Sequence, residues 1–365
     1  MPEPREELRA ARRVILKIGS AALWKDPELP GRLADQVARI SARQCAVVIV
    51  SSGAIALGWQ RLGYRERPKD TGELQASAAA GQSVLMHRYE AALGNVGLVA
   101  AQVLLTHADL ADRTRVNNAR RALAALLEAR AVPIINENDT VATDELRFGD
   151  NDQLAAMVAP LVSADVVVFL STVDGVLDAQ GERIRIMHAG ESVQAHRTSA
   201  GAPGSGGIQS KVDAARKAQS SGAAAIVANA SEPDVLVRIL AGEDVGTLFA
   251  PRGEPLRARK HWIAYTLRPR GAVLLDAGAV EAVRAKNRSL LPVGVIGVRG
   301  DFHPGDAVRL VGPDGAEVGR GLTRLGAIEV ARAAGKRAPE LQTLFGGERD
   351  VIVVHRDDLV VDPEA

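Results

Sequence analysis

The sequence predicts an α/β protein: an open sandwich with a mainly parallel sheet, followed by a small β-rich domain. Through about the first 250 residues, short β-branched runs alternate with longer Ala- and Leu-rich segments, which is typical of a parallel sheet covered by helices. Beyond that point the apolar runs become short and glycine-punctuated. A length of 365 residues also favours two domains. We therefore predict domains at residues 1–255 and 271–365, joined by a linker at 256–270.

The predicted elements of the first domain alternate regularly along the chain. The strands are short apolar runs, and the helices carry apolar residues at three-to-four spacing. Ligands of such sheets bind beyond the carboxyl ends of the strands, so the loops after the strands are where we look for chemistry. In chain order, we expect strands at 14–16, 46–50, 98–105, 132–135, 166–170 and 224–228, and helices at 31–43, 73–93, 117–129, 152–161 and 211–221.

The second domain is predicted from five short runs. The turn sequence Pro313-Asp314-Gly315 between the third and fourth of them predicts a hairpin. A proline- and arginine-rich stretch near residue 255 marks the boundary before this domain. The expected strands lie at 273–275, 293–296, 307–311, 317–318 and 351–354.

Composition excludes several classes of protein and site. Lys and Arg number 45 and Asp and Glu 44, a net charge of +1, which disfavours a general binder of polyanions. Cys45 is the only cysteine, so disulfides within the chain and Cys-rich zinc sites are excluded, and no protein-built metal site is predicted. Residues 1–13 lack the apolar core of a signal peptide, and no apolar run reaches membrane-spanning length. A cytoplasmic protein is expected.

Two predicted strands end in residues suited to binding an anion. Lys17 ends the first strand, where burial of its charge is costly unless an anion meets it; otherwise the side chain emerges into solvent. The second strand ends in Ser51-Ser52-Gly53 directly before a helix, whose first amides attract a carboxylate or phosphate. Ser52 as an ordinary helix cap is the alternative.

Three later segments add polar groups at further strand ends. Residues 136–139 and 148–152 form a dense acidic and amide cluster, and a polar turn follows at 171–175. A Gly-rich segment, 201–211, opens a helix and carries Lys211, but it does not match the P-loop pattern and also fits a flexible surface loop. Two lysines with an acidic cluster between them in sequence predict phosphoryl transfer, in which positioning and charge neutralisation do most of the work.

These segments together resemble a known family. Lys17-Ile18-Gly19-Ser20, Ser51-Ser52-Gly53-Ala54, Asn136-Glu137-Asn138-Asp139, Gly149-Asp150-Asn151-Asp152 and Gly206-Gly207-Ile208-Gln209-Ser210-Lys211 resemble the glutamate 5-kinases of the amino acid kinase family. Residues from about 272 to 361 are similar to the PUA domain that many bacterial members carry. The resemblance covers nearly the whole chain and implies an open αβα sandwich of the amino acid kinase type with a PUA-like tail.

The resemblance also implies an activity and its partners. It implies ATP-dependent phosphorylation of the γ-carboxylate of L-glutamate to L-glutamyl 5-phosphate, the first step of proline biosynthesis, by direct in-line transfer. ATP is then the co-substrate with Mg²⁺, and proline is an inhibitor acting at or beside the glutamate site. A homo-oligomer, dimer or tetramer, and channelling of the product to glutamyl phosphate reductase are further implications.

Individual site residues follow from the same resemblance. Lys17 and Lys211 would neutralise the transferring phosphoryl group, with Asp150 orienting them. Ser171-Thr172 replaces the Thr-Asp of many members, with Asp174 two residues later, which leaves the role of that acid open. Glutamate would be held by Ser52, Asp139 and Asn151, with the amides of Gly53 and Ala54 at its reacting carboxylate; the nucleotide would lie over Lys17, Ser171, Thr172, Ser205, Gly206, Gly207, Ile208, Gln209, Ser210 and Lys211.

Two other functions compete with this interpretation. A kinase of the same fold acting on N-acetylglutamate would need room for an acyl group where Asp139 suggests an ammonium pocket. An RNA-binding or RNA-modifying protein is the second, because PUA domains occur in such enzymes. Residues 261–365 hold 14 Lys and Arg and 14 Asp and Glu, which disfavours nucleic acid as a partner, although a local basic patch would be compatible with this balance.

Overall fold

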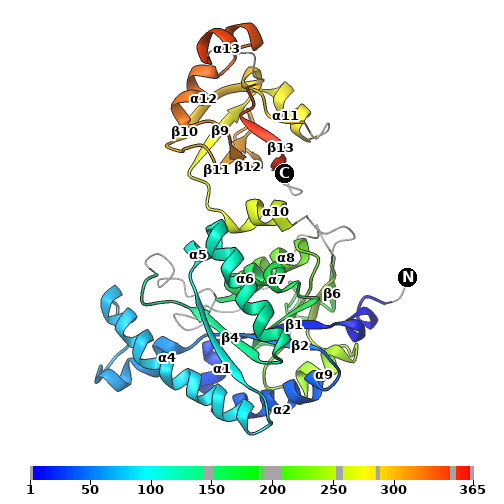
Figure 1. Ribbon diagram of the computed structural model, residues 1–365. Coiled ribbons are helices and arrows are strands. Elements are labelled where there is room, and N and C mark those ends of the chain that lie inside the picture. Colours follow the sequence, from blue (N-terminus) through cyan, green and yellow to red (C-terminus); the bar gives the residue numbers. More distant parts are fainter. Residues whose placement is uncertain are drawn as a thin grey trace. The chain divides into compact units, whose positions relative to one another are not determined.

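The computed structural model describes residues 3–142, 151–188, 191, 207–251, 258–284, 288–345 and 351–361. The chain divides into two compact units, Met1–Pro255 and Leu256–Ala365, each of which is described by itself (Figure 1). None of the described helices is both long enough and apolar enough to cross a membrane.

The first unit is built on a mainly parallel eight-stranded sheet in the order β3-β4-β2-β1-β5-β7-β8-β6. Among the described strand pairs of this sheet, β7 and β8 alone are antiparallel. The α/β prediction is confirmed, and each of the six predicted strands is present; β6 and β8 were not predicted. The strands are β1 (Arg13–Ile18), β2 (Ala46–Ser51), β3 (Ala100–Leu105), β4 (Val132–Glu137), β5 (Val166–Ser171), β6 (Ile186–Met187), β7 (Ala224–Asn229) and β8 (Thr247–Phe249).

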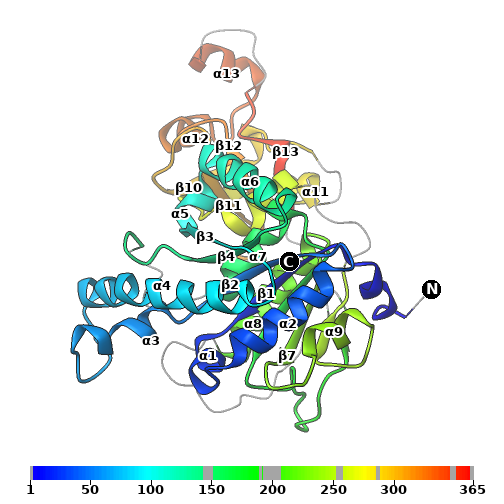
Figure 2. The same ribbon diagram turned by 60° about the horizontal axis from the view of Figure 1, so that its bottom comes forward.

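Helices cover both faces of this sheet (Figures 1 and 2). One buried cluster joins the sheet to α2, α4 and α9, and a second cluster joins its other face to α6, α7 and α8. All five predicted helices are present, with ends within four residues of those expected. The helices are α1 (Ser20–Lys25), α2 (Leu29–Ser41), α3 (Ala54–Gly58), α4 (Thr71–Gly94), α5 (His107–Ala111), α6 (Arg113–Glu128), α7 (Asn151–Val162), α8 (Ile208–Ser220) and α9 (Val235–Leu240).

Strand alternation decides which face each residue of the central strands meets. Val14, Leu16 and Ile18 of β1 pack with the α2 side, whereas Ile15 packs with the α7 side. Since successive side chains point to opposite faces, Lys17 lies on the α7 and α8 side. By the same rule Ser51, at the end of β2, lies on the α4 side.

Helix α3 packs against α4 at a separation that only glycine permits. A Cβ atom on Gly81 would overlap the carbonyl oxygen of Ala54, and one on Gly58 would overlap that of Ser77. This contact holds the start of α3 against the helix that also carries Gln82 and Tyr89.

The second unit contains a five-stranded sheet in the order β10-β9-β11-β12-β13. The predicted hairpin is confirmed: β11 and β12 pair antiparallel, and Gly315 in their turn has a φ of 82°. The strands are β9 (Gly271–Leu275), β10 (Val295–Gly300), β11 (Ala307–Val311), β12 (Glu317–Thr323) and β13 (Val354–Val361), and the helices are α10 (Ala258–His261), α11 (Ala277–Arg284), α12 (Ala327–Ala333) and α13 (Ala338–Phe345).

The strands expected at 293–296 and 317–318 instead span Val295–Gly300 and Glu317–Thr323, and two further details differ from the sequence-based expectation. The last strand was expected at 351–354, but it begins at Val354 and continues to Val361. Its exposed residues Arg356 and Asp357 interrupt the apolar pattern by which strands are predicted, so the sequence did not indicate this continuation. The segment predicted as a linker is helical in part: α10 is followed by a π-helical turn at Trp262–Thr266, where Ala264 accepts a hydrogen bond from Arg320 at 3.0 Å.

Candidate functional site

The candidate site lies at the carboxyl ends of β1, β2 and β4, next to the first turns of α7 and α8. These strands are neighbours in the middle of the sheet, in the order β4-β2-β1. Parallel strands end at the same edge, so residues distant in sequence meet there. Most of the predicted site residues that the structure describes lie at this edge or in the loops that follow it.

Two lysines meet one aspartate in the interior of the site. Nζ of Lys17 lies 2.6 Å from Oδ1 of Asp152, and Nζ of Lys211 lies 3.1 Å from Oδ2 of the same carboxylate. The side chains of Lys17, Asp152 and Lys211 are 5%, 1% and 7% exposed. Lys17 comes from the end of β1, Asp152 from the first turn of α7, and Lys211 from the first turns of α8.

Two ammonium groups share one carboxylate in this ion cluster. Burial alone would raise the pKa of Asp152, but the charges and hydrogen bonds of Lys17 and Lys211 outweigh it and hold that pKa below its usual value. One carboxylate therefore stays ionised between two buried ammonium groups. Ammonium groups at the carboxyl edge of the sheet attract an anion, so the cluster is suited to binding one.

The predicted orienting acid, Asp150, lies outside the described residues. Among the described residues, the acid between the two lysines is Asp152, to which the sequence analysis had assigned no role. Asp152 belongs to the same polar string, and the signal that could have identified it is its place in the first turn of a helix that packs against β1.

An amide network forms the other half of the site. Nδ2 of Asn151 lies 2.7 Å from the carbonyl oxygen of Ser51, 3.0 Å from Oγ of Ser52 and 2.9 Å from Oδ1 of Asn136. Nδ2 of Asn136 donates to Oε1 of Gln82 at 2.7 Å. The structure thus brings the predicted Ser52 and Asn151 together, and adds Asn136 and Gln82.

The start of α3 faces the same loops. Gly53 has a φ of 108°, in the left-handed region that favours glycine, and precedes α3 directly. The first amides of a helix have no acceptor within the helix, so those of Gly53 and Ala54 are suited to an anionic group. Beneath them, Oγ of Ser51 and the hydroxyl of Tyr89 form a buried 2.9 Å hydrogen bond.

Asp139 follows β4 and is half-buried. Burial raises its pKa to about 6. An ammonium ligand beside this carboxylate would favour its ionised form, so Asp139 is suited to binding an ammonium group.

The predicted nucleotide residues lie at the ends of β5 and the start of α8. Ser171 ends β5 and Thr172 follows it, exposed. The carboxylate of Asp174 accepts a 2.7 Å hydrogen bond from Asn229 at the end of β7. Gly207 caps α8, with Ile208, Gln209, Ser210 and Lys211 in its first turns, whereas Ser205 and Gly206 lie outside the described residues.

The described residues provide no cage for a resident metal ion. They contain no group of three or more His, Cys, Asp or Glu side chains placed to share one ion, and both oxygens of Asp152 face lysines. Mg²⁺ is commonly bound through substrate phosphates and water, so it would reach this site together with a nucleotide.

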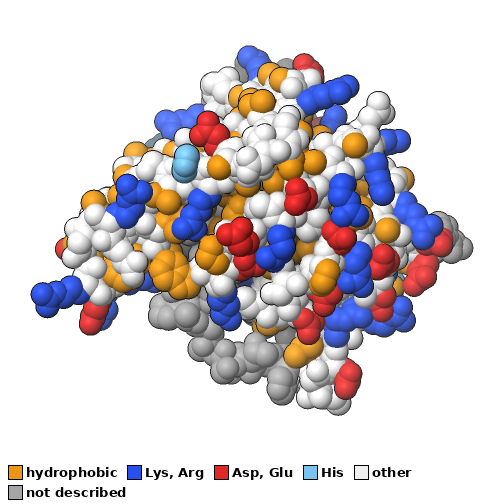
Figure 3. Space-filling view, turned by 90° about the horizontal axis from the view of Figure 1, so that it is seen from below, with side chains coloured by type: hydrophobic (Ala, Val, Ile, Leu, Met, Phe, Trp, Pro, Cys, Tyr) orange, Lys and Arg blue, Asp and Glu red, His pale blue; other side chains and the backbone are white. Residues whose placement is uncertain are grey.

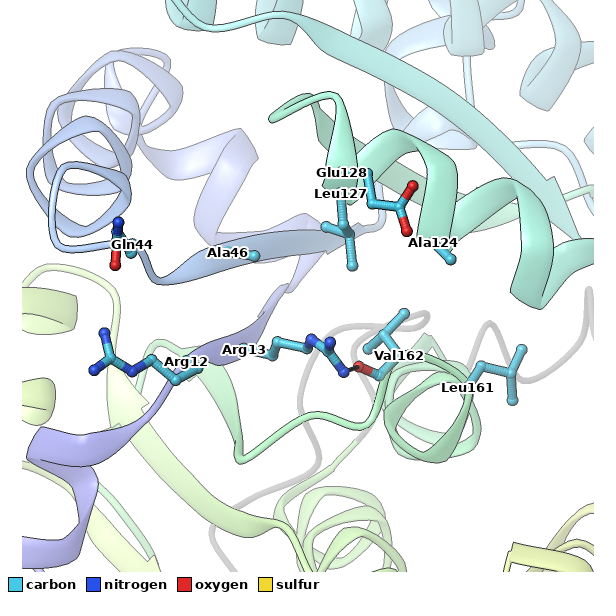
Figure 4. Close-up of a pocket in the computed structure, with 9 residues that line it drawn as sticks. All are labelled: Arg12, Arg13, Gln44, Ala46, Ala124, Leu127, Glu128, Leu161 and Val162. Atoms are coloured by element: carbon cyan, nitrogen blue, oxygen red, sulfur yellow. Dashed lines mark hydrogen bonds between the residues drawn. The ribbon is translucent and has the colours of Figure 1, made fainter.

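A cavity of about 400 Å³ lies at the opposite edge of the sheet (Figure 4). Arg12, Arg13 and Ala46 line it from the amino ends of β1 and β2, and Leu127 and Leu161 line it from α6 and α7. The guanidinium groups of Arg12 and Arg13 already donate to the carbonyl oxygens of Arg43 and Val162. No residue predicted for the site lines this cavity.

The exposed charges on the face shown in Figure 3 are mixed in sign. Lys and Arg side chains alternate there with Asp and Glu, in keeping with the balanced composition.

Comparisons with known proteins show the family of this chain. A model of the amino acid kinase family matches residues 12–229, and a model of the PUA domain matches residues 271–345. The chain is 46% identical over 369 residues to the glutamate 5-kinase of Chromohalobacter salexigens, covering 98% of each chain. It is 45% identical over 374 residues to that of Thioalkalivibrio sulfidiphilus, covering 99% of this chain and all of the relative.

One solved structure with a similar fold is the N-acetylglutamate synthase from Neisseria gonorrhoeae, complexed with coenzyme A and N-acetyl-glutamate. It matches with a TM-score of 0.51 over 69% of this chain and 62% of its own. At 17% identity this likeness shows the fold alone.

Proposed function

The chain belongs to the glutamate 5-kinases of the amino acid kinase family, and from that premise we propose that its site transfers the γ-phosphoryl group of ATP to the γ-carboxylate of L-glutamate. The product is L-glutamyl 5-phosphate, and the reaction is the first step of proline biosynthesis. The observation that carries the proposal is the buried cluster of Lys17, Asp152 and Lys211 at the carboxyl edge of the sheet.

Charge is the main obstacle to this reaction. The glutamate carboxylate and the ATP phosphates are both anions and repel each other until positive groups lie between them. Lys17 and Lys211 supply this charge, and Asp152 fixes where each ammonium group stands. Preorganised charge of this kind stabilises the transition state without reorganisation at the moment of transfer.

The acceptor needs no activation by a base. A carboxylate is already ionised at neutral pH and can attack the γ-phosphorus directly. The pKa of Asp152 is held low by its two lysines, so it is unsuited to accept a proton. Direct in-line transfer follows, with no covalent intermediate on the enzyme.

Glutamate is held at its other end by the polar residues after β2, β4 and at the start of α7. Asp139 binds the ammonium group, and Ser52 and Asn151, which share a hydrogen bond, hold the substrate with it. The amides of Gly53 and Ala54 meet the reacting carboxylate. Binding of the free ammonium group by Asp139 favours glutamate over N-acetylglutamate, in which that charge is absent.

ATP binds with Mg²⁺ on its phosphates. The turn after β5, with Ser171 and Thr172, contacts the nucleotide on one side, and the start of α8, from Gly207 to Lys211, contacts it on the other; Ser205 and Gly206 complete the predicted set. In this chain Asp174 is paired with Asn229 rather than placed directly after Ser171. The backbone of the turn, more than an acid, then provides the contacts of the nucleotide.

Proline inhibits by competing for the glutamate site. Its ammonium and α-carboxylate groups match those of glutamate, whereas it lacks the reacting carboxylate. A homo-oligomer, transfer of the product to glutamyl phosphate reductase and RNA binding by the PUA domain stay predictions.

ATP- and Mg²⁺-dependent formation of an acyl hydroxamate tests the proposal. The purified protein is assayed with glutamate, aspartate and N-acetylglutamate, each with and without proline. Hydroxamate from glutamate, suppressed by proline, is the expected result. Absence of glutamyl hydroxamate, or faster reaction with N-acetylglutamate, would overturn the proposed substrate.

A further inference from the structure

Three side-chain amides lie in one chain of hydrogen bonds between α4 and the site. Gln82 on α4 accepts from Nδ2 of Asn136 at 2.7 Å, and Oδ1 of Asn136 accepts from Nδ2 of Asn151 at 2.9 Å. Asn136 is 2% and Asn151 5% exposed, so water does not compete for these bonds.

A backbone group fixes the direction of the whole chain. The N–H of Glu137 lies 2.9 Å from Oδ1 of Asn136 and can only donate. The oxygen of the Asn136 amide must therefore face Glu137 and Asn151, and its nitrogen must face Gln82. For the same reason Gln82 presents its oxygen to Asn136, and Asn151 presents its nitrogen.

The orientation of Asn151 has a chemical consequence for the substrate. With its nitrogen turned toward Ser51, Ser52 and Asn136, the amide oxygen lies on the opposite side and is the acceptor. At neutral pH the hydrogen bond donor of L-glutamate is its ammonium group. An Asn151 amide turned the other way would offer that ammonium a donor instead.

Gln82 is the last member of this chain. Its own Nε2 is buried and has no hydrogen bond partner among the described residues, so its oxygen provides the observed link. If that oxygen were removed, the buried Nδ2 of Asn136 would lose its acceptor. Asn136 could not turn its amide over to compensate, because its nitrogen would then meet the N–H of Glu137.

We infer that Gln82 is a positioning residue for the amino acid substrate: by accepting from the buried Nδ2 of Asn136, it holds Asn136 where it accepts from Asn151, and so keeps Asn151 in the place from which its oxygen accepts a hydrogen bond from the ammonium group. This inference rests on the proposed function. It concerns a residue of α4 that acts through another side chain and lies outside the polar strings that predicted the site.

Two substitutions at one position test the inference. Gln82→Met is close in size but removes the acceptor, and Gln82→Glu keeps a carbonyl oxygen for Asn136 in either protonation state. Loss of a buried hydrogen bond partner should raise the KM for glutamate about tenfold in Gln82→Met, with the KM for ATP unchanged. Gln82→Glu should stay within about threefold of wild type, since its acceptor is retained.

A matched control separates positioning from stability. Gln36 on α2 is also buried, and its Oε1 accepts from the N–H of Leu236 at 2.9 Å, away from the site. Gln36→Met should lower the melting temperature but leave the KM for both substrates unchanged. The rise in melting temperature that glutamate produces should shrink in Gln82→Met and persist in Gln36→Met.

The outcomes separate this inference from the proposed function. Wild-type protein that forms no glutamyl hydroxamate refutes the function itself. If wild type is active, the inference fails when Gln82→Met keeps its glutamate KM, when both KM values rise together, or when Gln82→Glu is as impaired as Gln82→Met. Should Gln82→Met not fold, Gln82→Leu, which also lacks the acceptor, takes its place: a tenfold rise in its glutamate KM supports the inference, and a KM within threefold of wild type overturns it.

Discussion

Replacing Asp152 with asparagine removes a negative charge that pairs with two buried lysines while keeping the size of the side chain. The carboxylate lies 2.6 Å from Nζ of Lys17 and 3.1 Å from Nζ of Lys211, and its side chain is 1% exposed. Coulomb's law with an effective dielectric constant of about 20 gives gross attractions of about 6 and about 5 kcal/mol at these distances. Desolvation offsets much of this sum, and breaking a buried pair typically costs about 3–5 kcal/mol.

We therefore expect Asp152→Asn to lower the free energy of unfolding of the first unit by about 3–5 kcal/mol. For a unit of this size the melting temperature should fall by about 10 °C. With the two ammonium groups no longer held in place, kcat should fall about a hundredfold or more, as when one preorganised transition-state donor is lost. Because the folded-state pKa of Asp152 is lowered, its contribution is complete above about pH 4 and is lost as the pH falls through that lowered pKa.

Calorimetry and the hydroxamate assay measure the two effects on the same preparations. Asp234→Asn is the control: Asp234 is half exposed, pairs with Arg39 on the surface and has a φ of 50°, which asparagine tolerates. Loss of this surface ion pair should lower the free energy of unfolding by at most about 1 kcal/mol and leave kcat unchanged. If Asp152→Asn were as stable as Asp234→Asn and turned over at more than a third of the wild-type rate, the assigned role of the buried cluster would be wrong.

Three further predictions follow from the same structure. Lys17→Ala and Lys211→Ala should each lower kcat by about a hundredfold or more and change the KM for glutamate little, because the charge of each lysine acts on the transition state. Steady-state kinetics that showed a raised KM with a normal kcat would contradict this prediction. Burial raises the pKa of Asp139 to about 6, so its ionised form is lost below that pH. Glutamate should therefore bind more weakly at pH 5 than at pH 7.5. The Asp139→Asn variant should bind glutamate weakly at both pH values, and isothermal titration calorimetry measures both effects. Gly81→Ala should destabilise the protein by about 2 kcal/mol or more and impair activity, because the added Cβ would overlap the carbonyl oxygen of Ala54 in α3. Gly94→Ala is the control, since there is open space around Gly94 at the end of the same helix, and it should leave stability unchanged. Equal melting temperatures of the two variants would refute the close-packing argument.

Much of the first unit's fold could be predicted because its strands are buried on both faces. Continuous apolar runs such as 46–50 and 166–170 stand out from the helices between them, and each lies in an observed strand. The strands that escaped prediction are β6 and β8, of two and three residues. Runs this short carry no periodicity, and their pairing depends on neighbours supplied by the rest of the sheet.

The candidate site, like the fold, could be predicted from the sequence only in part. Sequence by itself determined which kinds of side chain stand at the strand ends, and therefore that Lys17, Lys211 and a group of acids and amides are available for phosphoryl transfer. Only the tertiary structure decided which of them meet. Lys17 reaches Asp152 because strand alternation turns it toward α7, and Gln82 reaches Asn136 because α4 packs beside the end of β4. Hydrogen bonds and ion pairs act over about 3 Å, whereas these residues are separated by 54 to 135 positions in the chain, so only the packing of α4 and α7 against the sheet brings them within range.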